Sequence, residues 1–248
     1  MAKYLIIIPT YNEAENIHDL FLDLLEFIDK NSISNEFMIL NVDDNSPDGT
    51  AQIVKQIQAS SATHISQLIR SGKLGLGPAY LAGFHWGLER DFDFFIEMDA
   101  DGSHSVADLQ KLINASHEGN FVIGTRWIKG GSVLNWPCHR KLISLFGTKY
   151  ASKVLNLPYR DLTSGYRVIS REILEGINLE NITVKGYGFQ IEMVMRAESG
   201  GFQIIQTPIT FTERTMGKSK MTFGIALEAF YRVTRWGFER RFRQRFHR

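Results

Sequence analysis

The chain has 248 residues, of which 44% are hydrophobic and 22% charged, and its formal net charge is +1. This composition is typical of one globular domain with a sizeable core, and it excludes a disordered chain and a polyanion binder that relies on its overall charge. The single cysteine, Cys138, excludes an intramolecular disulfide. No apolar stretch approaches the roughly 20 residues that a membrane-spanning helix needs.

The first half of the chain alternates between two kinds of hydrophobic pattern. Continuous runs rich in β-branched and aromatic residues predict strands, and apolar residues that recur every three or four positions predict helices. In chain order we predict strand 3–8, helix 14–30, strand 36–42, helix 50–58, strand 65–69, helix 78–89, strand 92–98, helix 106–117 and strand 121–124. This alternation favours an α/β fold, a mostly parallel sheet with helices on both faces.

The second half is less regular. There the patterns predict helix 141–155, strand 162–170, helix 189–198, two short strands in 202–211 separated by Pro208, and a long helix 223–246. No repeat or low-complexity linker interrupts the chain. We therefore predict one catalytic domain, residues 1–222, followed by a basic amphipathic helix, residues 223–248.

Polar clusters follow three of the predicted strands, at 9–13, 43–50 and 99–104. In open α/β sheets, ligands bind beyond the carboxyl ends of the strands. Because all three clusters fall at such ends, we expect a binding site where they meet.

Asp99 and Asp101 follow the apolar strand 92–98. In extended chain, residues two apart point to the same side, so both carboxylates can address one cation. Mg²⁺ or Mn²⁺ relieves their repulsion and takes its remaining ligands from water and substrate phosphates. The alternative is a solvated turn or a helix start, and His104 is more readily interpreted as a helix-start residue than as a support for the pair.

Asp44 allows two interpretations that are compatible with each other. The cluster around it is rich in turn formers and helix-capping residues, so it can cap the following helix. The same turn can present the Asp44 carboxylate to a nucleotide base or ribose. The glycine-rich segment 71–77 lacks the Walker pattern, and we interpret it as a turn that leads into the next helix.

Taken together, the three clusters resemble the inverting, GT-A-fold glycosyltransferases of family 2. Within that family the chain is similar to the dolichol-phosphate mannosyltransferases, also called polyprenol-phosphate-mannose synthases. The motifs that carry this closer resemblance are Gly124-Thr125-Arg126, Arg140 with Ser144, Thr163-Ser164-Gly165-Tyr166-Arg167, the segment 186–192, and Arg214 with Gly217-Lys218-Ser219-Lys220. The resemblance extends over residues 3–222 and implies a Rossmann-like GT-A fold.

The resemblance also implies roles for individual residues. The expected nucleotide-sugar site consists of Pro9, Tyr11, Glu13, Val42, Asp44, Asp99, Ala100, Asp101, Arg214 and Lys220. The expected metal ligands are Asp99, Asp101 and Ser103, where Ser103 replaces a frequent Gln and a water can bridge to the metal. The acceptor phosphate is assigned to Arg126, Arg140 and Ser144, and these three with Asp101 form the expected catalytic set.

The implied reaction moves mannose from GDP-mannose to a polyprenyl (dolichyl) phosphate and depends on Mg²⁺ or Mn²⁺. A phosphate acceptor is already ionised, so the reaction does not need a general base. Two alternatives stay open: a UDP-sugar transferase, for example of glucose, to a lipid phosphate or a glycan, and a nucleotide-sugar-binding subunit without turnover. For Arg126, the structural alternative to phosphate binding is an ion pair with a carboxylate in the core.

The C-terminal segment interleaves aromatic and apolar residues with arginines. The apolar set is Phe223, Leu227, Phe230, Val233, Trp236, Phe238, Phe242 and Phe246, and the basic set is Arg232, Arg235, Arg240, Arg241, Arg243, Arg245 and Arg248. A basic amphipathic helix of this kind is typical of membrane-surface binding. We expect its first half to pack on the domain and Arg240 onward to face lipid headgroups. The expected location is the cytoplasmic face of a membrane, with no nucleic-acid partner.

Overall fold

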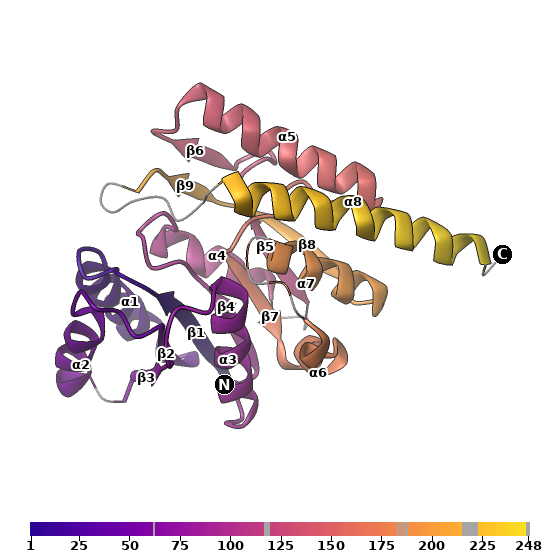
Figure 1. The fold of residues 1–248 in the computed structure, drawn as a ribbon. Helices are drawn as coiled ribbons and strands as arrows, with labels where there is room; N and C mark the ends of the chain where they lie inside the picture. The colour runs from indigo at the N-terminus through magenta and orange to yellow at the C-terminus, as the bar shows by residue number, and fades with distance from the viewer. Residues whose placement is uncertain are drawn as a thin grey trace.

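The computed structural model describes residues 1–61, 63–116, 120–182, 184, 186, 188–214 and 223–246. At its centre lies a seven-stranded sheet in the order β3-β2-β1-β4-β7-β5-β8 (Figure 1). Its strands are β1 (Ala2–Thr10), β2 (Asn35–Asp43), β3 (Ile65–Ile69), β4 (Phe94–Glu97), β5 (Phe121–Thr125), β7 (Arg167–Ser170) and β8 (Ile204–Pro208). A separate parallel pair consists of β6 (Ser132–Leu134) and β9 (Thr210–Thr212).

Helices cover both faces of the central sheet. They are α1 (Ile17–Asn31), α2 (Thr50–Ser60), α3 (Leu76–Leu88), α4 (Leu109–Ala115), α5 (Cys138–Leu155), α6 (Arg171–Gly176), α7 (Gly188–Ser199) and α8 (Phe223–Phe246), with 3₁₀ turns at Val106–Asp108 and Leu179–Asn181. Along β1, Tyr4, Ile6 and Ile8 belong to one hydrophobic core, whereas Leu5 and Ile7 belong to the core on the opposite face. Burial on both faces explains why β1 is apolar throughout, and it confirms the predicted mostly parallel α/β sheet.

The sheet departs from parallel order at β7. This strand lies between β4 and β5 and runs antiparallel to both. It is also shorter than the predicted strand 162–170. Residues before it leave the ladder because the Leu162 and Ser164 carbonyl oxygens turn to accept hydrogen bonds from the buried Arg167 guanidinium, at 3.0 and 2.7 Å.

The C-terminal helix α8 packs along α5 (Figure 1). The rings of Tyr150 and Phe230 stack at 4.6 Å, and Tyr150 Oη is 2.7 Å from Thr234 Oγ1. Docking of the first half therefore agrees with expectation, but Arg240 does not face outward alone, because it pairs with Glu198 of α7. The side chains of Phe223, Arg243, Arg245 and Phe246, and all of Arg248, lie outside the described residues. Within the described part of the chain, every helix is too short or too polar to cross a bilayer.

Candidate active site

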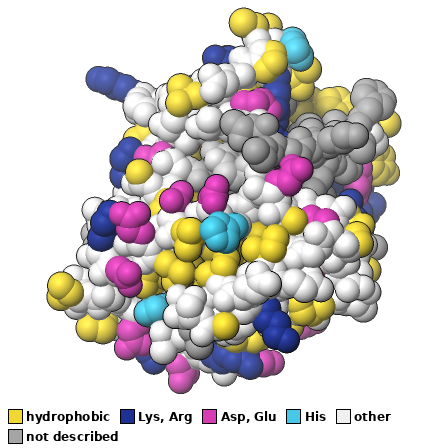
Figure 2. Space-filling view, turned by 90° about the vertical axis from the view of Figure 1, so that its left-hand side faces the viewer, with side chains coloured by type: hydrophobic (Ala, Val, Ile, Leu, Met, Phe, Trp, Pro, Cys, Tyr) yellow, Lys and Arg dark blue, Asp and Glu magenta, His cyan; other side chains and the backbone are white. Residues whose placement is uncertain are grey.

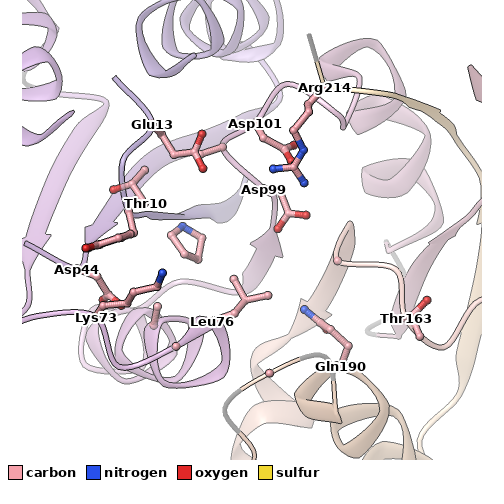
Figure 3. A pocket seen from close by; sticks show the side chains of 17 residues that line it. Thr10, Glu13, Asp44, Lys73, Leu76, Asp99, Asp101, Thr163, Gln190 and Arg214 are labelled. Atoms are coloured by element: carbon pink, nitrogen blue, oxygen red, sulfur yellow. The ribbon is translucent and has the colours of Figure 1, made fainter. Parts of the chain in front are cut away.

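A pocket of about 340 Å³ opens where β1, β2 and β4 end (Figure 3). The residues that line it are Pro9, Thr10, Tyr11, Glu13, Asp44, Lys73, Gly75, Leu76, Ala79, Asp99, Ala100, Asp101, Thr163, Gly165, Gly186, Gln190 and Arg214. All three polar clusters that follow the predicted strands contribute to this lining. The expected meeting point at the carboxyl edge of the sheet is therefore present.

Most of the expected nucleotide-sugar residues line this pocket, but Val42 does not, and neither does the expected metal ligand Ser103. Val42 is fully buried in the core and pairs with Pro9 across the sheet, so its side chain packs under the site and does not line it. Ser103 is 1% exposed and its side chain is outside the lining. Lys220 falls outside the described residues.

The two interpretations of this cluster apply to different residues: Asp43 stabilises the turn, and Asp44 lines the pocket. Asp43 holds the turn: its carboxylate accepts hydrogen bonds from Thr10 Oγ1 at 2.7 Å and from the Ser46 main-chain N–H at 2.8 Å. Asp44 instead reaches the pocket, where its carboxylate accepts from Arg70 at 2.8 Å and from the Leu74 N–H at 3.1 Å. Burial raises the pKa of the Asp44 carboxyl above its ordinary value, although the Arg70 guanidinium opposes this.

The glycine-rich segment 71–77 contributes directly to the pocket, which corrects its interpretation as a mere turn. Lys73, Gly75 and Leu76 line the cavity, and the Lys73 ammonium lies 4.4 Å from the centre of the Tyr11 ring. Lys73 therefore adds a cation to the pocket that Asp44 also lines. Helix α3 begins at Leu76, two residues before the predicted start, so its first residue also belongs to the lining.

The carboxylates of Asp99 and Asp101 stand in the middle of the pocket (Figure 3). Arg214 forms an ion pair with Asp101 at 2.9 Å, and the Ser103 N–H donates to the same carboxylate at 3.0 Å. Tyr80 Oη donates to Asp99 at 3.4 Å. Burial, followed by the nearby Asp101 charge, raises the pKa of Asp99 to about 7. The pair therefore favours an added positive charge.

Among the described residues, no group of three or more His, Cys, Asp and Glu side chains forms a closed metal cage. Two carboxylates at the edge of an open pocket fit a hard cation that completes its shell with phosphate oxygens and water. The donor set is therefore suited to Mg²⁺ or Mn²⁺ held together with a diphosphate. Ser103 supports this set through its main chain, since its N–H holds Asp101.

His104 supports the carboxylate pair and does not begin a helix, because the following 3₁₀ turn starts at Val106. Its Nδ1 accepts a hydrogen bond from the Asp99 main-chain N–H at 3.1 Å. Its ring stacks on Tyr166 with centres 4.7 Å apart. Burial lowers the pKa of His104 to about 4, so the imidazole is neutral at neutral pH.

A buried ion pair lies directly beneath the site. Glu97 of β4 and Arg167 of β7 are both fully buried, and their side chains approach to 3.7 Å. Burial raises the pKa of Glu97 to about 7, an effect that Arg167 opposes. The Arg167 guanidinium also donates to the Gln190 carbonyl oxygen at 2.8 Å. This arginine thus ties β7, the segment before it and the first turn of α7 together under the pocket.

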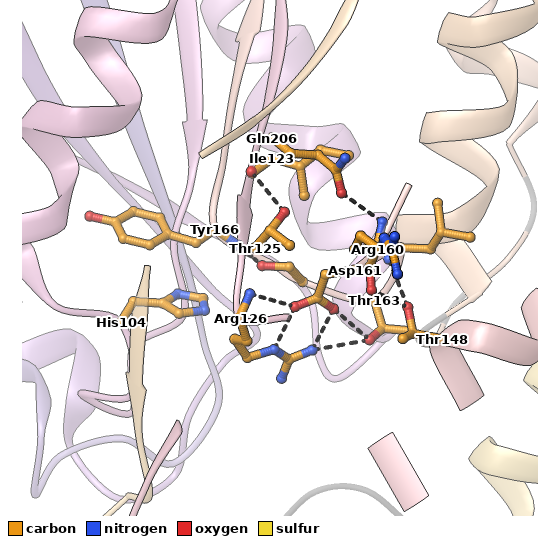
Figure 4. Close-up of polar contacts among 12 residues, drawn as sticks. His104, Ile123, Thr125, Arg126, Thr148, Arg160, Asp161, Thr163, Tyr166 and Gln206 are labelled. Atoms are coloured by element: carbon orange, nitrogen blue, oxygen red, sulfur yellow. Dashed lines mark hydrogen bonds and ion pairs between the residues drawn. The ribbon is translucent and has the colours of Figure 1, made fainter. Parts of the chain in front are cut away.

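The three expected acceptor-phosphate residues lie beside the pocket and outside its lining. Arg126 forms hydrogen bonds with Asp161 through its main-chain N–H, Nε and Nη2, at 3.0, 2.7 and 2.7 Å (Figure 4). The ion pair in the core, which was the structural alternative for Arg126, is therefore present. Arg126 also reaches the pocket indirectly, because its Nη2 donates at 3.2 Å to Thr163 Oγ1, and Thr163 is a lining residue.

Arg126 and Arg140 meet at one aromatic ring. Their guanidinium carbons lie 5.5 and 4.4 Å from the centre of the Trp136 ring. Arg140 forms an ion pair with Glu213, the neighbour of Arg214. Ser144 stands one helical turn after Arg140 on α5, and residues four apart share a helix face. The expected acceptor residues thus gather next to the expected donor residues.

The residues that sequence reasoning missed are Arg70, Lys73, Tyr80, Thr163 and Gln190. Thr163 and Gln190 belong to motifs that carried the family resemblance, but no role was assigned to them. Arg70 directly precedes the segment 71–77, which was interpreted as a turn, and Lys73 lies within it. Their common feature is that the three-dimensional fold brings them to the pocket from segments outside the three polar clusters.

Comparison with known proteins agrees with this geometry. Residues 5–177 match the family Glycosyl transferase family 2. The chain is 42% identical over 236 residues to the polyprenol monophosphomannose synthase of Mycolicibacterium smegmatis, which covers 95% of this chain and 87% of that protein. It is 44% identical over 235 residues to the undecaprenyl-phosphate mannosyltransferase of Micrococcus luteus, with coverage of 95% and 94%.

A solved structure shows the same fold at low sequence similarity. The mannosyltransferase of Pyrobaculum calidifontis in complex with GDP-Man and Mn²⁺ superposes with a TM-score of 0.59 at 16% identity, covering 97% of this chain and 64% of that one. The sheet, the pocket at its carboxyl edge and the match over most of the sequence lead to one conclusion: the chain belongs to glycosyl transferase family 2.

Proposed function

We propose that this chain transfers a mannosyl group from GDP-mannose to a polyprenyl phosphate, with Mg²⁺ or Mn²⁺ as cofactor. The observation that carries the proposal is the arrangement within one pocket of Asp44 at one end and the Asp99–Asp101 pair in the middle. The relatives at 42% and 44% identity are named for mannosyl transfer to polyprenyl phosphates, which supports the choice of sugar and acceptor.

In the proposed reaction, an oxygen of the lipid phosphate attacks the anomeric carbon of mannose. The bond from that carbon to the diphosphate oxygen breaks, and GDP leaves with the bonding electrons. Attack from the side opposite the leaving group inverts the anomeric configuration. The acceptor oxygen carries no proton at neutral pH, so this chemistry needs no general base. Asp161 and Glu213, the carboxylates beside Arg126 and Arg140, are engaged in ion pairs with these arginines.

The chain supplies charge to bind and orient these anions. Asp99 and Asp101 would hold the metal, which supplies Lewis-acid stabilisation of the departing diphosphate. Arg214 and Lys73 line the same pocket and can bind phosphate oxygens. Arg126, Arg140 and Ser144 would bind the lipid phosphate, and Thr163 connects Arg126 to the donor pocket.

We further propose that the lipid is reached at the cytoplasmic face of a membrane through α5 and α8. On α5, Leu142, Ile143 and Phe146 are 66–70% exposed. On the adjacent α8, Leu227, Phe230, Tyr231, Phe238 and Phe242 are exposed as well. Hydrophobic side chains gather at the top of the face in Figure 2, where α5 begins. Such a patch beside Arg140 suits a surface that holds a lipid tail near its phosphate.

The test is a transfer assay with purified protein, a polyprenyl phosphate, Mg²⁺ or Mn²⁺, and labelled GDP-mannose or UDP-glucose. The proposal expects label to enter the lipid phase from GDP-mannose and to stop when a chelator is added. Transfer from UDP-glucose alone would overturn the donor and keep the acceptor. If neither donor transfers or releases its nucleoside diphosphate, the proposed activity is wrong and the chain is a binding subunit.

A further inference from the structure

Gln190 is a buried amide without a described partner. The residue is 1% exposed in the first turn of α7, and neither Oε1 nor Nε2 has a hydrogen-bond partner among the described residues. A buried amide that forms no hydrogen bond is unfavourable, and such groups are rare in native proteins. The side chain nevertheless lines the pocket, and its amide end points into it (Figure 3).

The position of Gln190 is held from both sides, so the orientation of the amide has a structural cause. Its carbonyl oxygen accepts a hydrogen bond from the buried Arg167 at 2.8 Å. The neighbouring Phe189 ring stacks on Tyr80 of α3 with centres 6.0 Å apart. Arg167 also holds the segment before β7. The backbone of this turn is therefore anchored while the side-chain amide has no described partner.

Glu97 is the internal alternative as a partner. Gln190 lies near enough to lower the pKa of the Glu97 carboxyl, yet no hydrogen bond of normal geometry joins the two side chains. A bond to Glu97 in its ionised form, as in the ion pair with Arg167, would satisfy only the amide nitrogen, since an ionised carboxylate accepts and does not donate. The amide oxygen would still lack a donor. A ligand that both donates and accepts satisfies the whole amide.

The pocket places such a ligand group beside Gln190. A nucleotide-sugar is linear, with a nucleoside, a diphosphate and a hexose in that order. Asp44 and Lys73 mark the nucleoside end, and the Asp99–Asp101 pair marks the diphosphate (Figure 3). Gln190 lies on the side of the carboxylate pair away from Asp44 (Figure 3), and the lining also includes Gly165 and Gly186, which have no side chains. A donor laid along this axis would direct its hexose toward Gln190.

We propose that Gln190 is a sugar-specificity residue, whose amide forms hydrogen bonds with hydroxyl groups of the transferred hexose. A hydroxyl is both a donor and an acceptor, which matches the two unpartnered atoms of the amide. This inference rests on the proposed function for the identity of the sugar. Its central claim is that Gln190 binds the sugar and not the nucleotide. Gln190 thus differs from Asp44, which the proposed function assigns to the nucleoside.

The experiment compares the dissociation constants of GDP-mannose and GDP by calorimetry with Mn²⁺ present. The variant Gln190→Met keeps the volume and removes both hydrogen-bonding atoms. We expect it to weaken GDP-mannose roughly tenfold, a typical cost for lost hydrogen bonds to a ligand, and to leave GDP within about twofold of the wild type. The matched control Asp44→Asn is expected to weaken GDP-mannose and GDP equally.

Equal weakening of both ligands by Gln190→Met, or no weakening of either, would overturn the inference. The variant Gln190→Asn keeps the amide but shortens the side chain by one methylene, and we expect it to show the same selective loss of GDP-mannose affinity. It provides a second test if Gln190→Met does not fold. If wild-type protein does not bind GDP-mannose, the proposed donor is wrong. The same comparison with UDP-glucose and UDP then tests Gln190 by itself, with the same selective loss expected.

Discussion

The buried imidazole of His104 helps to position Asp99, a proposed metal ligand. Its Nδ1 accepts the Asp99 main-chain N–H, and this bond requires the unprotonated nitrogen. The ring is 3% exposed and lies between Tyr166 and Phe211. Burial lowers the pKa of His104 from 6.5 to about 4. The fold therefore depends on a neutral histidine at this position.

This histidine predicts a specific pH dependence of stability. Between pH 6.5 and about 4, the unfolded chain binds a proton at His104 that the folded chain does not bind, so the free energy of unfolding falls as the pH falls through this window. The loss from this residue is at most about 3 kcal/mol. Urea titrations at pH 7, 6, 5 and 4 measure this fall. We expect the free energy of unfolding of the variant His104→Gln to decrease less between pH 7 and pH 4 than that of the wild type.

The comparison between variant and wild type is needed because Asp99 acts in the opposite direction. Its pKa is raised to about 7, so between its ordinary value and pH 7 the folded chain keeps a proton that the unfolded chain releases, and this contribution to stability falls as the pH rises. Parallel stability curves for wild type and His104→Gln would contradict the role given to the imidazole.

At the residue scale, sequence reasoning found the acidic side chains and Arg214, the partner of Asp101, but not Arg70, the partner of Asp44. Asp99 and Asp101 were predictable because two carboxylates directly follow an apolar strand. The partner of Asp44, Arg70, comes from the far end of β3, and Gln190 comes from α7. These contacts depend on which strands become neighbours in the sheet. Sequence spacing between positions 44, 70 and 190 contains no such information.

At the element scale, helix α3 packs closely on the sheet, and this packing fixes the position of β4 and of Asp99 and Asp101, which follow it. Gly83 and Gly87 lie one helical turn apart on the same face of α3. A Cβ added at Gly83 would stand 2.6 Å from Ile7 Cγ2, and one at Gly87 would stand 2.5 Å from both Leu5 and Phe95. Larger residues at these positions would push the helix away from β1 and β4.

Gly83→Ala is therefore expected to destabilise the protein, although alanine favours helices by about 1 kcal/mol over glycine. Overpacking of this kind costs typically 1–3 kcal/mol, which exceeds the gain. The matched control is Gly147→Ala in α5, where an added Cβ meets no atom within 4 Å and the variant is expected to be as stable as the wild type or more so. Urea unfolding measures both, and a Gly83→Ala variant as stable as Gly147→Ala would refute the packing argument.

Strand and helix order was predictable for the first half of the chain, because each parallel strand is a continuous apolar run followed by an amphipathic helix. The antiparallel insertion of β7 was not predictable. β7 has four residues, and it finds its place between β4 and β5 through ladder hydrogen bonds with strands more than 40 residues earlier in the chain. Its first residue, Arg167, stabilises this arrangement by buried contacts with Glu97 of β4, with the segment before β7 and with α7.

At the scale of the whole molecule, the proposed membrane surface predicts lipid binding that depends on α5. The double variant Leu142→Ser and Phe146→Ser removes two of the most exposed apolar side chains of this helix. We expect it to bind anionic polyprenyl-phosphate vesicles on the order of 100-fold more weakly in sedimentation, because each buried apolar side chain contributes about 1.5–3 kcal/mol and two are removed. The matched control is Ile33→Ser, which changes an 87% exposed residue in the turn after α1. Equal binding by all three proteins would exclude α5 from the contact.

Two consecutive residues join the proposed donor and acceptor regions. Glu213 pairs with Arg140, and Arg214 pairs with Asp101. Both residues directly follow β9, so one short segment contacts the two proposed regions. A cation bound by Asp101 would compete with Arg214 for the same oxygens. We therefore predict that metal, diphosphate and Arg214 form one arrangement with the Asp99–Asp101 pair.

The measurement that tests this central claim most directly is calorimetry of GDP binding with and without Mn²⁺, for the wild type and for Asp101→Ala. The exposed Asp29→Ala on α1 is the control for removal of a carboxylate. We predict that Mn²⁺ raises the affinity of the wild type and of Asp29→Ala for GDP by at least about tenfold, or roughly 1.4 kcal/mol, and that this gain disappears in Asp101→Ala. A wild-type affinity that is independent of Mn²⁺, or a full gain in Asp101→Ala, would contradict the assignment of the pocket as a metal-assisted donor site.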